Sequence, residues 1–284
     1  MNQWGMDTAT VMHGVFGDPI KHSKSPIMHN RAFRELGLNA AYAAFHILPG
    51  QLKDAVAGIR ALQFRGVNVT IPHKLEVMDY LDEIDEDARA IGAVNTIVND
   101  GGKLTGYNTD GIGYVRSLKE EAGFSAAGKK VLLLGAGGAA RGVAYALAKE
   151  GASAVYIANR TVSKATELAD SISAYAPAYG MSFDETIDIR NDVELVVNNT
   201  SVGMHPNVDE VPIDTSWFHD RLTVSDLVYN PLVTRLLREA EAKGAKVHGG
   251  LGMFLYQGAY AFEYWTGREA PVAAMREAVL EAFR

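Results

Sequence analysis

Apolar residues in this chain gather in short runs, and stretches with the period of amphipathic helices lie between many of these runs. Such βα alternation predicts parallel strands with helices on both faces of the sheet. The runs that suit strands are 12–16, 41–47, 66–70, 92–97, 104–107, 131–134, 153–158, 195–198, 223–227 and 245–248. Helices are predicted at 25–36, 51–62, 75–91, 113–121, 232–243, 254–265 and 272–283, with another after 135–139 that ends at Gly151.

The start of the first helix has two interpretations. Ser25 precedes Pro26 and is predicted to cap the helix, because proline is favoured at the first helical position. The alternative is that Ser23 and Ser25, beside the free amides of a helix start, bind a small carboxylate. Further along the chain, the glycine-rich segment 249–253 is predicted to be a loop or hinge before the next helix.

The segment VLLLGAGGAARG at 131–142 has the order strand, glycine-rich turn, helix that is typical of dinucleotide sites. Gly135 allows the tight turn, Gly137 lets the backbone approach a pyrophosphate, and Ala140 lets the helix pack close to the strand. The pyrophosphate would lie on free amides at the positive end of this helix. A glycine triplet also suits an ordinary turn, so the interpretation depends on the residues C-terminal to it.

The position that selects between NAD and NADP lies about 20 residues beyond such a turn. Here it reads Asn159-Arg160-Thr161, with no acid to accept hydrogen bonds from an unmodified ribose. Arg160 can instead pair with a ribose phosphate, and Thr161 and Lys164 offer further donors. The segment therefore predicts NADP rather than NAD, the alternative being a solvated arginine at a strand end.

Three more polar residues follow or interrupt strand-like runs. Lys74 comes soon after the strand at 66–70, at an edge where open α/β sheets bind ligands, although most single lysines are solvated. Asn95 interrupts an apolar run, so its amide requires a definite partner. Asp110 can cap the helix at 113–121 or take part in a site. Local sequence leaves these alternatives open.

Composition narrows the class of protein. The 284 residues are 48% hydrophobic and 21% charged, as in soluble globular enzymes, and allow one large or two ordinary domains. The net charge of -7 argues against a general binder of nucleic acid or anionic membranes. The absence of cysteine excludes disulfides and thiolate chemistry, and the eight histidines lack paired ligand spacing, so no metal is expected.

The N-terminal segment has neither the basic stretch nor the long apolar run of a signal peptide. No apolar stretch is long enough to span a bilayer. We therefore expect a cytoplasmic protein.

Nine segments, in order along nearly the whole chain, resemble shikimate dehydrogenase of the NADP-dependent type. Each segment alone is weak evidence, whereas together they are highly specific. They are GDPIKHSKSPIMHN (17–30), NVTIPHK (68–74), GAVNTI (92–97), NTDG (108–111), GAGGAAR (135–141), NRT (159–161), NTSVGM (199–204), DLVYNP (226–231) and GGLGMFLYQ (249–257).

The resemblance implies an α/β protein of two domains. Residues 1–109 with 249–284 would form an open α/β substrate-binding and catalytic domain, to which the C-terminal helices return. Residues 110–248 would form a Rossmann-type NADP domain with a doubly wound parallel sheet.

The resemblance also implies a reaction, the reversible NADPH-dependent reduction of 3-dehydroshikimate to shikimate in aromatic amino-acid biosynthesis. Lys74 and Asp110 would be the catalytic couple. The implied substrate contacts are Ser23, Ser25, Thr70, Lys74, Asn95, Asp110, Tyr229 and Gln257. The implied contacts to NADP(H) are Gly135, Ala136, Gly137, Gly138, Ala139, Asn159, Arg160, Thr161, Lys164, Thr200 and Gly250. No nucleic-acid or membrane partner is expected, and the protein would be a monomer or homodimer.

Three alternatives compete with this function. A quinate/shikimate dehydrogenase of broader specificity shares the architecture, but Arg160 argues against its NAD-preferring form. Methylenetetrahydrofolate dehydrogenase also uses a lysine in two domains, yet the segments SKSP and NTDG fit it poorly. A non-catalytic NADP-binding sensor is disfavoured because both Lys74 and Asp110 are present.

Overall fold

The computed structural model describes residues 6–284 and divides the chain into two compact units. Residues 1–5, part of the N-terminal segment that lacks signal-peptide features, lie outside the described residues. The first unit consists of Met1–Thr109 and Gln257–Arg284, and the second of Asp110–Tyr256. Residues 249–256 thus group with the second unit, whereas the boundaries expected from the sequence include them in the first.

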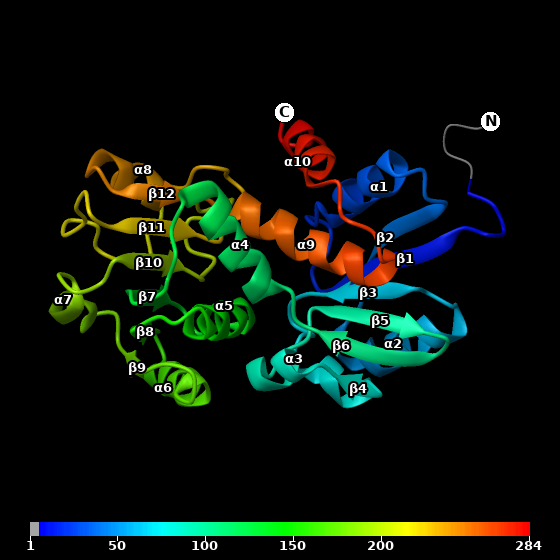
Figure 1. The fold of residues 1–284 in the computed structure, drawn as a ribbon, viewed down its shortest axis with the longest axis horizontal. Coiled ribbons are helices and arrows are strands. Elements are labelled where there is room, and N and C mark those ends of the chain that lie inside the picture. Colours follow the sequence, from blue (N-terminus) through cyan, green and yellow to red (C-terminus); the bar gives the residue numbers. More distant parts are fainter. Residues whose placement is uncertain (1–5) are drawn as a thin grey trace. The chain divides into compact units, whose positions relative to one another are not determined.

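The first unit is built on a mixed six-stranded sheet (Figure 1). β1 pairs in parallel with β2 and β3, whereas β5 and β6 form an antiparallel hairpin. The hairpin turns at Gly101 and Gly102, which have φ angles of 60° and 100°, a conformation that glycine adopts at little cost. The strand order is β2 (Ala40–His46), β1 (Val11–Gly17), β3 (Gly66–Val69), β5 (Thr96–Asp100), β6 (Lys103–Tyr107) and β4 (Glu83–Ile84).

Helices from distant parts of the sequence cover this sheet. The 3-10 turn η1 (Pro49–Gln51) leads into α2 (Leu52–Ala61), whose buried side chains join those of β3, β5 and β6 in one apolar cluster. α1 (Ser25–Glu35) lies beside α10 (Val272–Glu281). Trp265, near the end of α9 (Gly250–Thr266), donates its indole N–H to the Ile97 carbonyl at 3.0 Å. The last 28 residues therefore complete the core of the first unit.

The prediction of one helix at 75–91 is wrong. The chain forms the 3-10 helix η2 (Glu76–Tyr80), then β4, then α3 (Glu86–Ile91). The helix is interrupted at Asp82, whose Oδ2 accepts hydrogen bonds from the Leu104 amide at 2.7 Å and from Arg60 Nη2 at 2.8 Å. Asp85 then caps α3 by accepting from the Asp87 amide at 3.0 Å. Partners outside this segment thus override its helical pattern.

The core of the first unit contains the buried histidine His29. His29 is fully buried between the rings of Tyr42 and Trp265, at centroid distances of 4.5 and 5.3 Å. Its ring nitrogens have no hydrogen-bond partner among residues 6–284. Burial, with a smaller effect of nearby His13, lowers the pKa of His29 to about 3. His29 therefore stays neutral in the folded protein under conditions that protonate it in the unfolded chain.

We predict that this burial weakens folding below pH 6.5. The folded-state pKa of His29 lies below its ordinary value of 6.5, so the unfolded chain binds the proton first as the pH falls. At pH 5, this difference in pKa lowers the free energy of unfolding by about 2 kcal/mol. The free energy of unfolding in urea should be measured for wild type and His29→Leu at pH 7.5 and 5.0. Between these two pH values, the variant should lose about 2 kcal/mol less of this free energy than wild type. Equal losses in the two proteins would contradict the prediction, and the comparison cancels the titrating groups that do not interact with His29.

The second unit contains a six-stranded, all-parallel sheet (Figure 1). The chain starts in the middle of this sheet, runs outward to one edge, and then returns to the middle and runs to the other edge. Ligands of such sheets bind at the carboxyl ends of the two central strands, where the direction reverses. The strand order is β12 (Lys246–His248), β11 (Thr223–Asp226), β10 (Leu195–Asn198), β7 (Lys130–Leu134), β8 (Ala154–Ala158) and β9 (Ala178–Met181).

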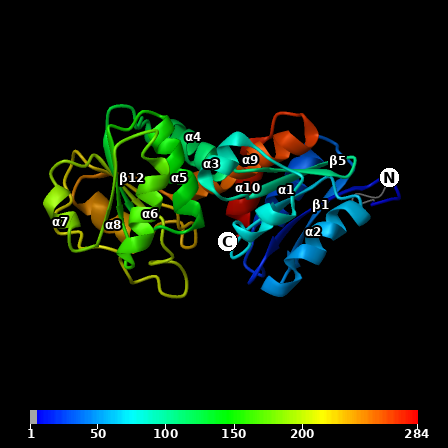
Figure 2. The ribbon, with the colours of Figure 1, turned by 90° about the horizontal axis from the view of Figure 1, so that it is seen from below.

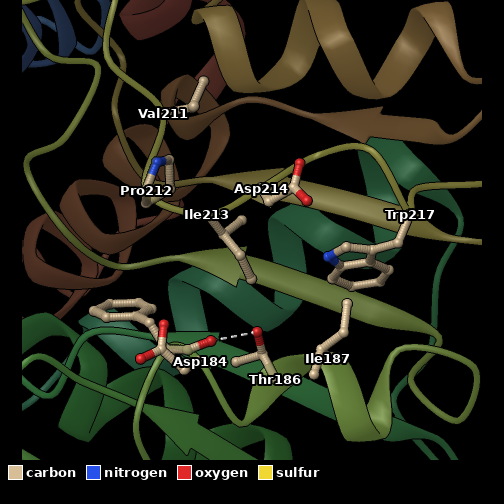
Figure 3. Close-up of a pocket in the computed structure, with 9 residues that line it drawn as sticks. Asp184, Thr186, Ile187, Val211, Pro212, Ile213, Asp214 and Trp217 are labelled. Atoms are coloured by element: carbon tan, nitrogen blue, oxygen red, sulfur yellow. Dashed lines mark hydrogen bonds between the residues drawn. The ribbon is translucent and has the colours of Figure 1, made fainter.

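Helices flank this second sheet. α4 (Asp110–Ala122) and α5 (Gly138–Lys149) lie side by side (Figure 2), and α5 also contacts α6 (Val162–Ile172). α8 (Arg235–Ala242) packs on a cluster with side chains of β7, β10 and β11. The connection from β9 to β10 contains only the short α7 (Thr186–Ile189). Beside α7, the segment 211–217 borders a hollow of about 500 Å³, with Ile213 and Trp217 in its wall (Figure 3). Three of these elements, α6, α7 and β9, were not predicted from the sequence.

The prediction of a loop or hinge at 249–253 is also wrong, because α9 already begins at Gly250. The glycines permit close packing here rather than a turn. A Cβ on Gly250 would lie 2.3 Å from the Leu227 carbonyl oxygen, and one on Gly252 would lie 2.0 Å from Ser117 Oγ. No helix in the described part of the chain is both long enough and apolar enough to cross a membrane.

Candidate active site

A turn at the carboxyl end of β3 carries Thr70 and Lys74. His73 holds this turn in place: its buried ring donates from Nε2 to the Ile47 carbonyl at 2.7 Å, and its amide donates to the Thr70 carbonyl at 2.9 Å. The Lys74 carbonyl accepts a hydrogen bond from the Val94 amide at 2.8 Å. Lys74 is thereby fixed beside the segment that leads into β5. His73 was not predicted from the sequence, because nothing in the local pattern indicates its distant partner.

Asn95 lies just before β5, and its side chain is anchored within the first unit. Its Oδ1 accepts from the Thr109 amide at 2.8 Å and from Thr96 Oγ1 at 2.9 Å, while its Nδ2 donates to Thr109 Oγ1 at 3.0 Å. The expectation that this amide has definite partners is confirmed. Because the Asn95 carbonyl also accepts from the Val69 amide at 2.8 Å, Asn95 lies next to the strand end that carries Thr70.

The prediction that Ser25 caps α1 is wrong. Lys24 occupies the N-cap position, and Ser25 and Pro26 are the first two helical residues. Lys24 has φ and ψ of -92° and -1° rather than the extended conformation of most caps. The Ser25 amide donates to Ser23 Oγ at 3.3 Å. The Ser23 hydroxyl, which lies before the helix, thus accepts a hydrogen bond from this amide. The Ser25 hydroxyl instead bonds Tyr42.

A buried polar network connects Ser25 with Asn95. The Tyr42 hydroxyl donates to Asn68 Oδ1 at 2.7 Å, and Asn68 Nδ2 donates to the Asn95 carbonyl at 3.2 Å and to Thr96 Oγ1 at 3.1 Å. Burial raises the pKa of Tyr42 well above its usual range, although a hydrogen bond with Ser25 opposes this effect. Tyr42 therefore remains a neutral donor. Neither Tyr42 nor Asn68 was predicted from the sequence; a polar residue within the buried strand β3 is the signal for the latter.

The glycine-rich turn of the second unit lies at the carboxyl end of central strand β7. Gly135 has φ of 99°, and a Cβ there would lie 2.9 Å from Thr200 Cγ2. A Cβ on Gly137 would meet nothing within 4 Å, so open space borders the turn. α5 begins at Gly138, and Ala140 is fully buried. No side chain of residues 6–284 caps the start of α5, so its first amides are the kind of group that binds phosphate. Ala136 and Ala139 complete the turn.

Thr200 is held beside this turn by a chain of buried polar groups. Its amide and hydroxyl donate to Asn198 Oδ1 at 3.0 and 2.7 Å, and Asn198 Nδ2 donates to Asp226 Oδ1 at 3.0 Å. Thr234 Oγ1 donates to Asp226 Oδ2 at 2.6 Å. Burial raises the pKa of Asp226 to about 6, against the effect of these hydrogen bonds. The ends of β10 and β11 are thereby fixed around the point where the sheet reverses direction.

The predicted cofactor-selecting residues follow β8. Asn159 Nδ2 donates to the Thr161 carbonyl at 2.9 Å, which shapes the approach to α6. Arg160, Thr161 and Lys164 are exposed at the start of that helix. Within the chain that the structure describes, no carboxylate pairs with Arg160. Its guanidinium is therefore available to an anion.

The remaining predicted residues lie on α4, on α9 and after β11. Asp110 is the first residue of α4 and is 5% exposed. Gly250 is the first residue of α9. Tyr229 follows β11 and stacks on Phe254 at a centroid distance of 4.7 Å, and burial raises its pKa. Gln257 is also on α9, in the part that belongs to the first unit.

Each unit thus gathers its own set of predicted residues. The first unit holds Ser23, Ser25, Thr70, Lys74, Asn95 and Gln257. The second holds Asp110, Tyr229 and the whole predicted cofactor set, in which Gly135 and Thr200 are neighbours. Among residues 6–284, no group of three or more histidine, aspartate or glutamate side chains is placed to hold a metal ion.

A parallel sheet with a glycine-rich turn at its reversal point, together with an α/β unit that carries an anchored lysine, defines a dehydrogenase of the two-domain dinucleotide-binding class. Three family models match the chain: "Shikimate dehydrogenase substrate binding domain" at 15–97, "Shikimate / quinate 5-dehydrogenase" at 117–208 and "Shikimate 5'-dehydrogenase C-terminal domain" at 250–280. The chain belongs to the shikimate dehydrogenase family.

Individual relatives match nearly the full length. Shikimate dehydrogenase (NADP(+)) of Methanopyrus kandleri is 52% identical, with 98% of both chains covered. A crystal structure of a shikimate dehydrogenase in complex with NADP+ superposes with a TM-score of 0.93 at 45% identity, covering 99% of this chain and 98% of the other. The shikimate 5-dehydrogenase of Listeria monocytogenes, in complex with shikimate and NAD, gives a TM-score of 0.91 at 41% identity, with 96% and 98% covered.

Proposed function

We propose that the protein is an NADP-dependent shikimate dehydrogenase, which reversibly reduces 3-dehydroshikimate to shikimate. The observation that carries the proposal is the placement of Lys74 and Asn95. The Val94 amide donates to the Lys74 carbonyl, and the adjoining Asn95 amide side chain is anchored on Thr109. These contacts support roles for the Lys74 side chain as a proton donor and for the nearby Asn95 amide as a binder of a ring hydroxyl, as a reaction at a ring carbon–oxygen bond requires.

The substrate-binding roles follow from the chemistry of each side chain. Hydroxyls of Ser23 and Ser25, at the start of α1, would bind the substrate carboxylate. Thr70 and Asn95 would bind the ring hydroxyls, since an amide and a hydroxyl can both donate and accept hydrogen bonds. Gln257 and Tyr229 would add polar contacts. The buried network through Tyr42 supports this assignment, because it limits the movement of Ser25 and Asn95 relative to each other.

Lys74 and Asp110 would perform the proton transfer. The Lys74 ammonium would deliver a proton to the reacting oxygen during reduction, and the amine would remove it during oxidation. Asp110 would orient the ammonium by accepting a hydrogen bond from it.

The second unit would bind NADP(H), which supplies or accepts the hydride. Two observations support this fit: open space beside Gly137 and the helix-start amides of α5. Ala136, Gly138, Ala139, Asn159, Thr200 and Gly250 would line the same site. Arg160 would hold the ribose phosphate, aided by Thr161 and Lys164. We further propose that the protein acts in the cytoplasm as a monomer or homodimer, which light scattering after gel filtration would distinguish.

Initial rates of cofactor reduction test the proposed function. We expect turnover with shikimate and NADP, and far slower turnover with quinate or with NAD. Comparable rates with quinate or NAD would instead indicate the quinate/shikimate enzyme of broader specificity. No turnover despite NADPH binding would point to a non-catalytic sensor.

A further inference from the structure

A buried histidine fixes α4 to the sheet of the second unit. His248, the last residue of β12, is 3% exposed, and burial lowers its pKa to about 4, so the ring is neutral at pH 7. Its Nε2 lies 2.7 Å from Ser117 Oγ on α4, and its Nδ1 lies 2.8 Å from Ser225 Oγ on β11. A neutral imidazole donates from one nitrogen and accepts at the other, so both hydroxyls are bonded. α4 is thereby tied to two strands through one ring.

The face of α4 that meets this ring also begins with Asp110. Tyr114 and Ser117 follow Asp110 at intervals of four and three residues, which places the three side chains along one side of the helix. Tyr114 is fully buried and meets His248 in an edge-to-face arrangement, at a centroid distance of 5.8 Å. A movement of Ser117 along the helix axis would therefore be transmitted to Asp110, about two turns away.

A second contact fixes α4 at the Asp110 end. A Cβ on Gly111 would lie 2.2 Å from the Gly142 carbonyl oxygen and 2.8 Å from Ala146 Cβ, so α4 and α5 approach at backbone distance. α5 is the helix that starts at the glycine-rich turn. The Gly111 contact holds the lateral position of the first turn, but it offers no directional bond along the axis. Ser117 and His248 supply such a bond on the side of α4 that carries Asp110.

Ser117 is also packed against α9. The Ser117 hydroxyl lies within 2.0 Å of the position that a Cβ on Gly252 would occupy. One helical turn later, the Tyr256 hydroxyl donates to Glu120 Oε2 at 2.5 Å, and Arg116 lies over the Tyr256 ring at 4.7 Å. Ser117 is therefore enclosed by the sheet and by a helix, with its hydroxyl bonded to the His248 ring.

We propose that Ser117 and His248 are positioning residues for the reaction: their hydrogen bond sets the axial position of α4 and thereby the placement of the Asp110 carboxylate. This inference rests on the proposed function, in which Asp110 pairs with the catalytic lysine. The hydroxyl and the imidazole touch neither substrate nor cofactor in this scheme. They act only through the helix that carries Asp110.

Ser117→Ala tests the inference in the full-length enzyme. We expect kcat for shikimate oxidation to fall about tenfold or more, since a small misplacement of a reacting group can cost up to ~10²-fold. The Kd of NADPH, measured by fluorescence titration, should stay within about twofold, because the glycine-rich turn is untouched. The pH profile of kcat/KM should shift by about half a unit or more, because the lysine loses its aligned carboxylate.

Two comparisons separate positioning from a loss of stability. Thr186→Ala removes another buried hydroxyl of the same unit, which donates to the Phe183 carbonyl at 2.7 Å, and should change neither kcat nor the pH profile. In an Asp110→Asn background, followed by single-turnover measurement, Ser117→Ala should have little further effect, because the two changes act on one interaction. If Ser117→Ala does not fold, His248→Gln serves in its place.

Each outcome decides the inference. A kcat within about twofold of wild type, or a lower kcat with an unchanged pH profile, overturns it. An equal loss from Ser117→Ala with and without Asp110→Asn also overturns it, and the pH profile decides alone where the Asp110→Asn rate is below detection. If wild type does not oxidise shikimate, the proposed function fails instead, and Asp110→Asn with wild-type activity would reject the role of Asp110 specifically.

Discussion

Lys74→Ala is expected to lower kcat for shikimate oxidation by about 10²–10⁴-fold, the usual contribution of a positioned acid–base group. No other ionisable group of the proposed substrate set in the first unit can donate a proton to the reacting oxygen. The turn that carries Lys74 is held by backbone and His73 contacts, which do not involve the lysine side chain. The variant should therefore fold and bind NADPH normally. Stopped-flow rates and fluorescence titration would measure the two properties.

A matched control is Lys53→Ala, which removes an exposed lysine from α2 of the same unit. That variant should have wild-type rates, so that a general effect of lost positive charge is excluded. If Lys74→Ala retained more than about a tenth of wild-type kcat, Lys74 could not be the proton donor. A selective rise in KM without a fall in kcat would indicate a binding role instead.

Arg160→Ala should raise KM for NADP by about 10–100-fold, because a hydrogen bond to a charged group contributes about 1.5–3 kcal/mol. KM for NAD should change little, since NAD has no ribose phosphate. The side chain is exposed and has no carboxylate partner among residues 6–284, so the substitution removes little else. The ratio of kcat/KM values for the two cofactors is the measurement.

Arg221→Ala provides the control, as it removes another exposed arginine of the second unit. An unchanged NADP preference in Arg160→Ala would mean that Lys164 and Thr161 alone hold the phosphate. Equal losses with NADP and NAD would show that Arg160 supports the fold of the site rather than cofactor choice.

Features encoded by contiguous residues were predictable from the sequence. The run before Gly135 and the turn itself are adjacent, and the segment Asn159-Arg160-Thr161 directly follows β8. Strand periodicity and glycine geometry are local properties, so a short window contains the needed information. The same holds for the hairpin at Gly101 and Gly102.

The errors arose where a distant partner decides the local structure. Asp82 interrupts a helical pattern because Leu104 and Arg60 bind its carboxylate. The sequence pattern places Gly252 in a loop, whereas in the structure the absence of a Cβ at Gly252 leaves room for the Ser117 hydroxyl. Tyr42 and His73 were missed because their partners, Asn68 and Ile47, are 26 residues away. Such contacts exist only after the fold has formed.

The discontinuity of the first unit has a consequence for biosynthesis. The Trp265 ring packs directly against Gly66, and Phe33 packs on Phe262 at 5.4 Å, so these early residues lack core partners until segment 257–284 leaves the ribosome. The second unit is one uninterrupted stretch. We therefore expect the second unit to fold before the first, although its residues are synthesised later than those of β1 to β6. This order is the reverse of the usual N-terminal-first order, and it leaves the strands of the first unit accessible to chaperones in the meantime.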